Sequence, residues 1–294
     1  MIEIKNKVKK MDRIRKNSRK IKSSNEAVAG IITAILIVGL IVIVISLIQT
    51  IYVPKWMGKI EAEHMGDVAN QFSQLKSAID IQSATGQKTP ISTFITLGNK
   101  EMPFFSASRA FGSLMILSDE CTVTISNGSS FSYSLGIIKY SSRNAYFLDQ
   151  SYIYEAGSVI LNQSEGNVMS IKPFSATNNV DIVNITFDIV NIVGIGGRTS
   201  AGGYGTYPIR TEFVSSNTVV MNNVESIKIA TNYPNAWHEA FNSTLIKSAG
   251  LIYGTDFSVM DTNSETTIAF IRVTVNLTLT IIEIDAQIAP GWVE

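Results

Sequence analysis

The sequence of 294 residues contains few of the side chains that build metal sites or covalent cross-links. It has one cysteine and two histidines, which excludes a disulfide framework, zinc fingers and most metal sites with several nitrogen or sulfur ligands. No phosphate loop or nucleophile elbow occurs. The patterns around Cys121, His64 and His238 favour packed or surface residues over a nucleophile or a base. We therefore predict no enzyme activity, no cofactor and no metal site.

The chain also lacks an overall excess of charge, with 24 basic and 24 acidic side chains. This balance is uneven along the sequence, because residues 1–22 contain ten of the basic side chains and only two of the acidic ones. The remaining 272 residues hold 14 basic against 22 acidic side chains, a net charge of −8. A nucleic-acid-binding domain usually carries a basic surface, so a nucleic-acid partner is disfavoured.

A long uncharged segment follows the basic residues. Residues 27–48 read AVAGIITAILIVGLIVIVISLI, with only Thr33 and Ser46 as polar interruptions. A helix of this length extends about 33 Å, which matches a hydrocarbon core of about 30 Å. It is longer than the apolar part of a secretory signal, about 7–15 residues. The cations before the span and the aromatic Tyr52 and Trp56 after it predict a single membrane span with the N-terminus in the cytoplasm.

The segment SSNEAVAGIITAILIVGLIVIV, residues 23–44, resembles the N-terminus of archaeal type IV pilins and archaellins. In that family a prepilin-type peptidase cuts before the apolar helix, between a small residue and an apolar one. The resemblance maps Glu26 and Ala27 onto the positions before the cut, and Val28 and Ala29 onto the start of the mature chain. It implies that residues 1–27 form a class III signal peptide. It also implies that like subunits bundle through this helix in a filament. Many such pilins have Ser-Pro after this Val, where this chain has Ala29 and Gly30.

Residues 54–83 have an apolar period of three to four, which predicts an amphipathic stalk helix. Its apolar stripe contains Met57, Ile60, His64, Val68, Phe72, Leu75 and Ile79, and the acidic Glu61 lies off this stripe. Pro54 is expected to kink the helix that enters from the span, because proline has no backbone N–H to donate.

Residues 84–294 alternate apolar and polar side chains, which predicts β-strands. Turns are expected at 127–130, 162–167, 194–205 and 215–217, where Gly, Asn and Ser gather. Strands that are half-buried and joined by short turns indicate an antiparallel sandwich. One helix is predicted at 233–249, with Asn232 as its cap, an apolar stripe through Trp237 and Phe241, and Gly250 at its end. The fold class is therefore α+β, with a long N-terminal helix and a β-rich head.

The alternation changes phase near the C-terminus. From Ile271 to Ile281 the apolar residues are odd-numbered, and from Ile282 to Ile288 they are even-numbered. Because a regular strand would place these two sets on opposite faces, we predict a β-bulge or bend at residues 280–283.

Asn-x-Ser/Thr sequons, the acceptor pattern for N-linked glycans, occur in the predicted head. They lie at Asn127, Asn162, Asn184, Asn242 and Asn276. Their number is close to that expected by chance, but all five fall in the part predicted to be outside the cell.

The organisation predicted is a leader at 1–27, a span at 28–53, a stalk at 54–83 and an extracellular head at 84–294. It favours a pilin-like structural or adhesive subunit of a surface filament, whose partners are membrane lipid, the prepilin-type peptidase and like subunits. The alternative is an uncleaved, membrane-anchored ectodomain that binds a ligand or a surface partner. Cleavage of the leader distinguishes the two.

Overall fold

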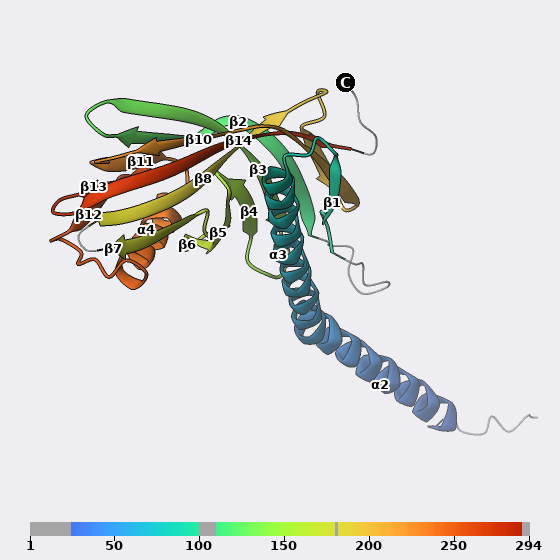
Figure 1. Cartoon of the computed structure of the whole chain (residues 1–294). Coiled ribbons are helices and arrows are strands. Elements are labelled where there is room, and N and C mark those ends of the chain that lie inside the picture. Colours follow the sequence, from blue (N-terminus) through green and yellow to red (C-terminus); the bar gives the residue numbers. More distant parts are fainter. Residues whose placement is uncertain (1–24, 100–109, 180–181, 290–294) are drawn as a thin grey trace, which may run out of the picture. The chain divides into compact units, whose positions relative to one another are not determined.

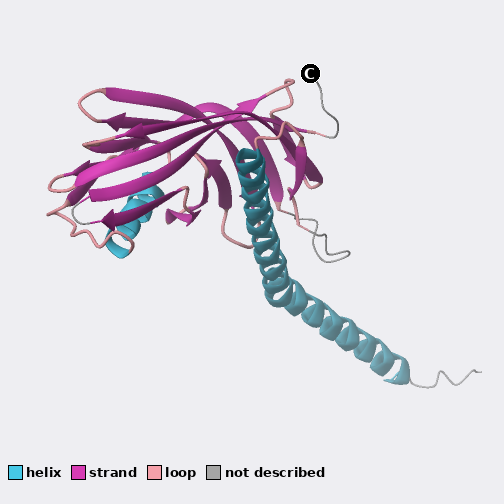
Figure 2. Ribbon diagram, viewed as in Figure 1, coloured by secondary structure: helices cyan, strands magenta, loops and turns pink. Residues whose placement is uncertain are grey.

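The computed structural model describes residues 25–99, 110–179 and 182–289 (Figure 1). The predicted leader therefore lies almost entirely outside the described residues. The chain divides into two compact units, Met1–Pro54 and Lys55–Glu294. The first unit carries the apolar helix. The second carries most of the stalk helix together with the β-rich head, and this order of elements confirms the α+β class (Figure 2).

The N-terminal helical region consists of α2 (Asn25–Leu47), a π-helical turn η1 (Ile48–Tyr52) and α3 (Val53–Thr85). In the π-helical turn the Val53 N–H donates to the Ile48 carbonyl, five residues back instead of four. Pro54 comes directly afterwards and has no N–H to donate. The irregularity that the sequence predicts at Pro54 thus takes the form of a π-helical turn, a common device where a helical hydrogen-bond ladder is interrupted.

Helix α3 buries the predicted apolar stripe, with Ile60 half-buried. The position of Glu61 differs from the prediction, since this side chain is 0% exposed. Its carboxylate accepts hydrogen bonds from the backbone N–H groups of Ala145, Tyr146 and Phe147, at 3.1, 2.7 and 2.7 Å. Three donors replace the water that a buried carboxylate loses, and they come from a loop distant in sequence.

The head contains two sheets (Figure 1). One has the strand order β1-β10-β14-β8-β7, and the other has the order β12-β13-β11-β2-β3-β4-β5-β6, with β9 paired to β2. The bounds are β1 Ile91–Thr96, β2 Phe111–Ser126, β3 Ser130–Arg143, β4 Gln150–Glu155, β5 Ser158–Gln163, β6 Gly166–Ile171, β7 Phe174–Asn179, β8 Ile182–Gly194, β9 Ser200–Gly203, β10 Thr206–Met221, β11 Ser226–Ala230, β12 Phe257–Asp261, β13 Glu265–Phe270 and β14 Thr274–Ile288.

One pair of strands at the centre of the first sheet departs from the predicted antiparallel sandwich. Strands β8 and β14 pair in parallel, from Thr274 opposite Ile182 to Ala286 opposite Gly194. A parallel pair needs a long connection, and here the chain passes through β9 to β13 and a helix before β14 returns. Alternation within one strand shows which side chains share a face, but it carries no information about the direction of the neighbouring strand.

The head has two hydrophobic cores, which we name after the helix that each contains. The α3 core includes Val68, Phe72, Leu75, Ile79, Ile95, Leu114, Ile138, Tyr140, Val190, Ile192, Ile209, Phe213, Ile282, Ile284 and Ile288. The α4 core includes Cys121, Val123, Ile125, Leu135, Ile137, Val183, Ile185, Phe187, Ile189, Ile227, Ile229, Trp237, Phe241, Leu245, Val275, Leu277 and Leu279. Several long strands contribute to both.

The two cores explain the phase change in β14, where the predicted bulge was wrong. The strand pairs with β8 in unbroken register through Ile281 and Ile282, so Val275 and Ile284 lie on opposite faces. Both side chains are nevertheless 0% exposed, because Val275 enters the α4 core and Ile284 enters the α3 core. Strand β8 changes core at the matching point, between Ile189 and Val190, which pair with Ile281 and Ile282.

The side chains of β10 pass from the α3 core to the α4 core at a β-bulge. The register of β10 against β14 shifts between Phe213 and Ser215, so that one extra residue reverses the face of everything after it. The turn predicted at 215–217 was therefore wrong, since these polar residues continue β10. The predicted loop at 194–205 is likewise interrupted by β9, which pairs with β2.

The backbones of the two sheets meet closely at Gly136 in β3. A Cβ atom at this position would lie 2.0 Å from the Ile192 carbonyl oxygen, so only glycine fits. The Gly136 N–H also donates to the Asn191 side chain at 2.9 Å. The neighbouring β3 residues divide here, with Ile137 in the α4 core and Ile138 in the α3 core. Gly136 thus lies at the boundary between the two cores.

The predicted helix in the head is α4, Pro234–Lys247, and its stripe through Trp237, Phe241 and Leu245 is buried as expected. Gly250 has a φ of +67°, and its N–H donates to the Ile246 carbonyl, four residues back, which is the αL type of helix end. The predicted cap was wrong. Tyr233 takes the cap position, and Asn232 instead donates to the Glu120 carboxylate at 3.2 Å, because β2 lies within its reach.

Candidate functional site

Helix α2 exposes its apolar surface on every side. The side chains from Val28 to Leu47 are all exposed. The Thr33 hydroxyl is satisfied within the helix, since it donates to the Ala29 carbonyl at 2.9 Å. The helical stretch that begins here contains an 18-residue window of mean hydropathy 3.3, of which none is buried. By length and composition this helix can cross a membrane, and among the described residues no second helix meets the same test.

The predicted processing residues lie in the first turn of α2, which begins at Asn25. Glu26, Ala27, Val28 and Ala29 are helical in backbone, and Val28 is exposed. Cleavage of the Ala27–Val28 bond stays a prediction.

The five sequons differ in their surroundings, although all five asparagines are half-buried. Asn127 lies in the turn between β2 and β3, and Asn162 lies in β5. Asn184 and Asn276 face each other across the parallel pair of β8 and β14. Asn242 lies in α4, and its side-chain oxygen is buried without a hydrogen-bond partner. Asn127 therefore has the most open backbone setting for a glycan, and Asn242 the least.

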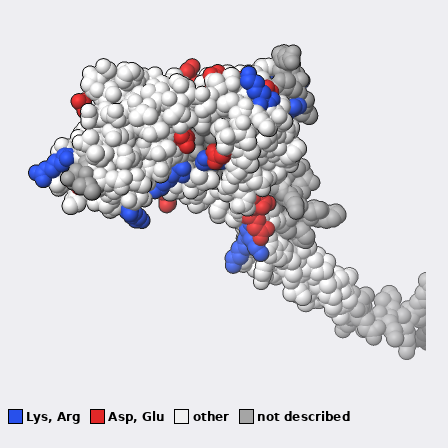
Figure 3. Space-filling view, viewed as in Figure 1, with Lys and Arg blue, Asp and Glu red and all other residues white. Residues whose placement is uncertain are grey.

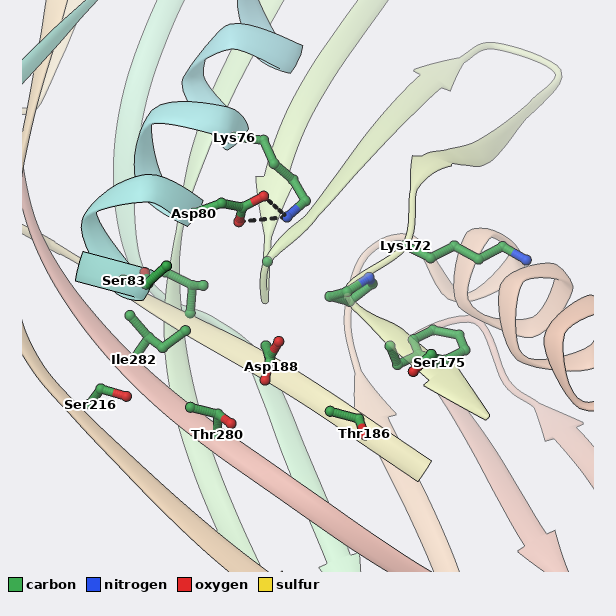
Figure 4. A pocket seen from close by; sticks show the side chains of 15 residues that line it. Lys76, Asp80, Ser83, Lys172, Ser175, Thr186, Asp188, Ser216, Thr280 and Ile282 are labelled. Atoms are coloured by element: carbon green, nitrogen blue, oxygen red, sulfur yellow. Dashed lines mark hydrogen bonds and ion pairs between the residues drawn. The ribbon is translucent and has the colours of Figure 1, made fainter. Parts of the chain in front are cut away.

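A polar groove of about 520 Å³ lies where α3 ends on the first sheet (Figure 4). Lys76 and Asp80 come from the last turns of α3 and form a bidentate ion pair, with Nζ to oxygen distances of 2.7 and 2.8 Å. The opposite side of the groove is formed by polar side chains that continue the sheet face covered by α3. These are Ser175, Thr186, Asp188, Ser216 and Thr280.

The groove is built by the change of core in β8 and β14. On the sheet face that packs against α3, the apolar side chains end at Ile282 in β14 and at Val190 in β8. Two residues earlier in each strand, the same face carries the polar Thr280 and Asp188. Hydroxyl groups both donate and accept hydrogen bonds, and the charged groups here are of both signs. The lining also includes apolar side chains such as Phe174, so it suits a ligand with both polar and apolar parts.

A second lysine at the groove, Lys172, resembles a catalytic base only superficially. Its Nζ donates to Ser243 Oγ at 2.7 Å and to Thr244 Oγ1 at 2.9 Å. Burial, and then the nearby Lys247, lower the pKa of Lys172. Ser243, however, donates its own proton to the Ala240 carbonyl of α4. The contacts join the turn that precedes β7 to α4.

A second fully buried carboxyl, Glu155, lies at the end of β4 and contacts Trp237 of the α4 core. Its Oε1 accepts from Thr231 Oγ1 and from Trp237 Nε1, both at 2.8 Å, while Oε2 has no hydrogen-bond partner among the described residues. Burial raises the pKa of the Glu155 carboxyl to about 7. Burial also raises the pKa of the neighbouring Cys121 thiol, with Glu155 adding to the shift. Cys121 is therefore a buried, protonated thiol, as its sequence pattern predicts.

The two histidines are packed or surface residues, as predicted. His64 Nε2 lies 3.1 Å from the Tyr140 hydroxyl, which donates to the Leu97 carbonyl, and burial lowers the pKa of His64. His238 Nδ1 lies 2.6 Å from the Asp261 carboxylate on the surface of α4. Within the described residues no group of three or more His, Cys, Asp and Glu side chains could hold a metal ion.

Sequence reasoning missed the groove, Glu155 and the contacts of Glu61. Lys76 and Asp80 are spaced i, i+4 on a helix, which signals an ion pair but not a groove. The polar residues of β8 and β14 signal a solvent face, and only the position where α3 ends turns part of that face into a groove. Glu155 precedes Ala156–Gly157, a hairpin turn with positive φ at both residues, and nothing local indicates that the carboxyl is covered.

Comparison with known proteins adds little to this geometry. No protein-family model matches the chain, and no solved structure matches it. A protein of Archaeoglobus fulgidus, described as uncharacterized, is 24% identical over 179 residues. The match covers 57% of this chain, and it spans only 31% of the length of that relative.

Proposed function

We propose that this chain is a pilin-like, membrane-inserted surface protein, and that it serves as a structural subunit of a filament or an adhesive surface structure. In this proposal the leader is removed before Val28, α2 anchors the subunit in the membrane and later packs against like helices, and the head is displayed outside the cell. We propose no cofactor. The proposed partners are lipid, a prepilin-type peptidase and like subunits.

The observation that carries the proposal is the exposed apolar surface of α2. Twenty consecutive side chains, from residue 28 to residue 47, are exposed, and none of them is charged. In water such a surface would be strongly unfavourable, at roughly 25 cal/mol for each Å² of apolar area. Lipid or neighbouring copies of the same helix would remove it from water. The basic residues before α2 and Lys55 and Lys59 after it favour a span over a buried core helix.

The decisive test is the N-terminus of the native protein. Mass spectrometry of protein purified from native membranes should find a mature chain that begins at Val28. Replacing Ala27 by Leu should block this cleavage, because the peptidase needs a small residue before the scissile bond. Ala27→Gly is the matched control, since it keeps a small side chain, and it should be processed. Recovery of wild-type chains that begin at Met1 would refute the proposed processing.

A second candidate function is a permanently anchored ectodomain that binds a ligand. The groove beside Lys76 and Asp80 favours this candidate, because about 520 Å³ lies within the range of small-molecule sites, about 300–1,000 Å³. An uncleaved chain that stays in the membrane after filaments are sheared from cells would support it. A cleaved chain found in the sheared fraction would support the filament subunit.

A further inference from the structure

The loop between β3 and β4, residues 144–149, holds apolar side chains out toward solvent. Leu148 is 53% exposed and Tyr146 is 40% exposed. The loop backbone is nonetheless well bonded. The Asn144 side chain donates to the Leu148 carbonyl at 2.6 Å, and the Asn144 N–H donates to Asp149 Oδ1 at 2.7 Å. The exposure of Leu148 therefore belongs to an ordered loop and is not the result of missing contacts.

Helix α3 holds this loop close to the point where the chain enters the second unit. Glu61 receives three backbone N–H groups from the loop, and the Tyr146 carbonyl oxygen would lie 3.2 Å from a Cβ atom at Gly58. Gly58 and Glu61 are three and six residues after Lys55, or about 5 and 9 Å along the helix. Figure 1 shows the β3–β4 connection extending beyond β4 and reaching α3 near the start of that helix.

The side chains around the loop match those of a membrane–water interface. Trp56 is 45% exposed at the start of the same helix, and aromatic side chains are enriched at this depth of a bilayer. Lys55, Lys59 and Arg143 add exposed positive charge. Figure 3 shows basic side chains grouped on the helix beside an acidic group, and Lys59 lies 3.7 Å from Glu63.

We propose that the β3–β4 loop is a second membrane contact, in which Tyr146 and Leu148 enter the lipid–water interface. This proposal rests on the proposed insertion of α2. The occupant of the surface is the head-group region of the bilayer, because the loop lies at the end of the head that continues into the span. Glu61 is a positioning residue, since its three hydrogen bonds hold the loop at this height on α3.

The test measures the depth of spin labels in the full chain. The native Cys121 stays in place, because it is buried and will not react with the label. Leu148→Cys and Tyr146→Cys are labelled with a nitroxide and reconstituted into mixed phosphatidylcholine–phosphatidylglycerol vesicles, which are isolated by flotation. Met260→Cys is the matched control, since Met260 is 61% exposed and lies in β12, beside the α4 core. Collision with oxygen is compared with collision with a water-soluble nickel chelate.

The labels at 146 and 148 should collide with oxygen several-fold more often, relative to the nickel chelate, than the label at 260. Adding Glu61→Gln to the Leu148→Cys chain should reduce this difference, because the loop then loses its charged acceptor. Floating chains whose label at 148 is as water-accessible as the label at 260 would overturn the loop contact alone. Chains that remain at the bottom of the gradient would overturn the insertion of α2, and the loop contact with it.

Discussion

The buried carboxyl of Glu155 makes the stability of the head depend on pH in a predictable direction. Its pKa is about 7 in the folded head, against an ordinary value of 4.5 for a glutamate carboxyl. A raised pKa means that the folded state holds the proton more tightly than the unfolded state. The resulting stabilisation is fully present below about pH 4.5, and it is lost as the pH rises through about 7.

The magnitude follows from the difference between the two pKa values. The rise from 4.5 to about 7 corresponds to roughly 3 kcal/mol, most of which falls between about pH 5 and pH 8. The neighbouring Tyr233 and Cys121 do not change charge between about pH 5 and pH 8. Burial raises the pKa of Tyr233 to about 12 and raises that of Cys121 well above its usual value. His64 changes charge in the same window but with the opposite sign, so a comparison with a variant is needed.

The assay is urea unfolding of the full chain in detergent micelles, followed by near-UV circular dichroism, for the wild type and Glu155→Gln. The free energy of unfolding of the wild type should fall relative to the variant by roughly 2–3 kcal/mol as the pH rises from about 5 to about 8. Only the pH dependence is compared, because the Gln amide adds N–H groups that the site does not pair. Parallel curves for the two proteins would refute the assignment of a raised pKa to Glu155.

Three further predictions concern the membrane span, strand β14 and the buried His64. Val38→Asp should cost roughly 2.5–3.5 kcal/mol on insertion scales and reduce the fraction of chain that resists carbonate extraction of membranes, whereas equal retention would contradict the span. Leu277→Ala and Ile284→Ala should each lower the free energy of unfolding by about 2–5 kcal/mol, since the two side chains fill different cores, and a small effect at either would contradict the two-core arrangement. His64→Gln should lose less stability than the wild type between about pH 7 and pH 5, because burial lowers the pKa of His64 and acid therefore favours the unfolded chain; an unchanged acid limb in urea unfolding would argue against this.

The sequence by itself determined the features that depend on near neighbours in the chain. The uncharged run from residue 27 predicts α2, the stripe through Phe72 predicts α3, and the stripe through Trp237 predicts α4. Periods of 3.6 and 2 residues reflect the geometry of a helix or a strand alone, so they can be read without knowing what packs against it. The phase change at Ile281 and Ile282 was also visible, and it correctly marked the point where the strand changes the face that it buries.

Only the tertiary structure decided what covers each face. If the head had a single core, the phase change would require a bulge. Because the head has two cores, β14 remains regular and buries both Val275 and Ile284. The direction of β8 against β14, the burial of Glu61 and Glu155, and the groove beside Asp80 depend in the same way on segments tens of residues apart. Alternation along a strand records which side chains avoid water, whereas the partner that excludes the water is set by long-range packing.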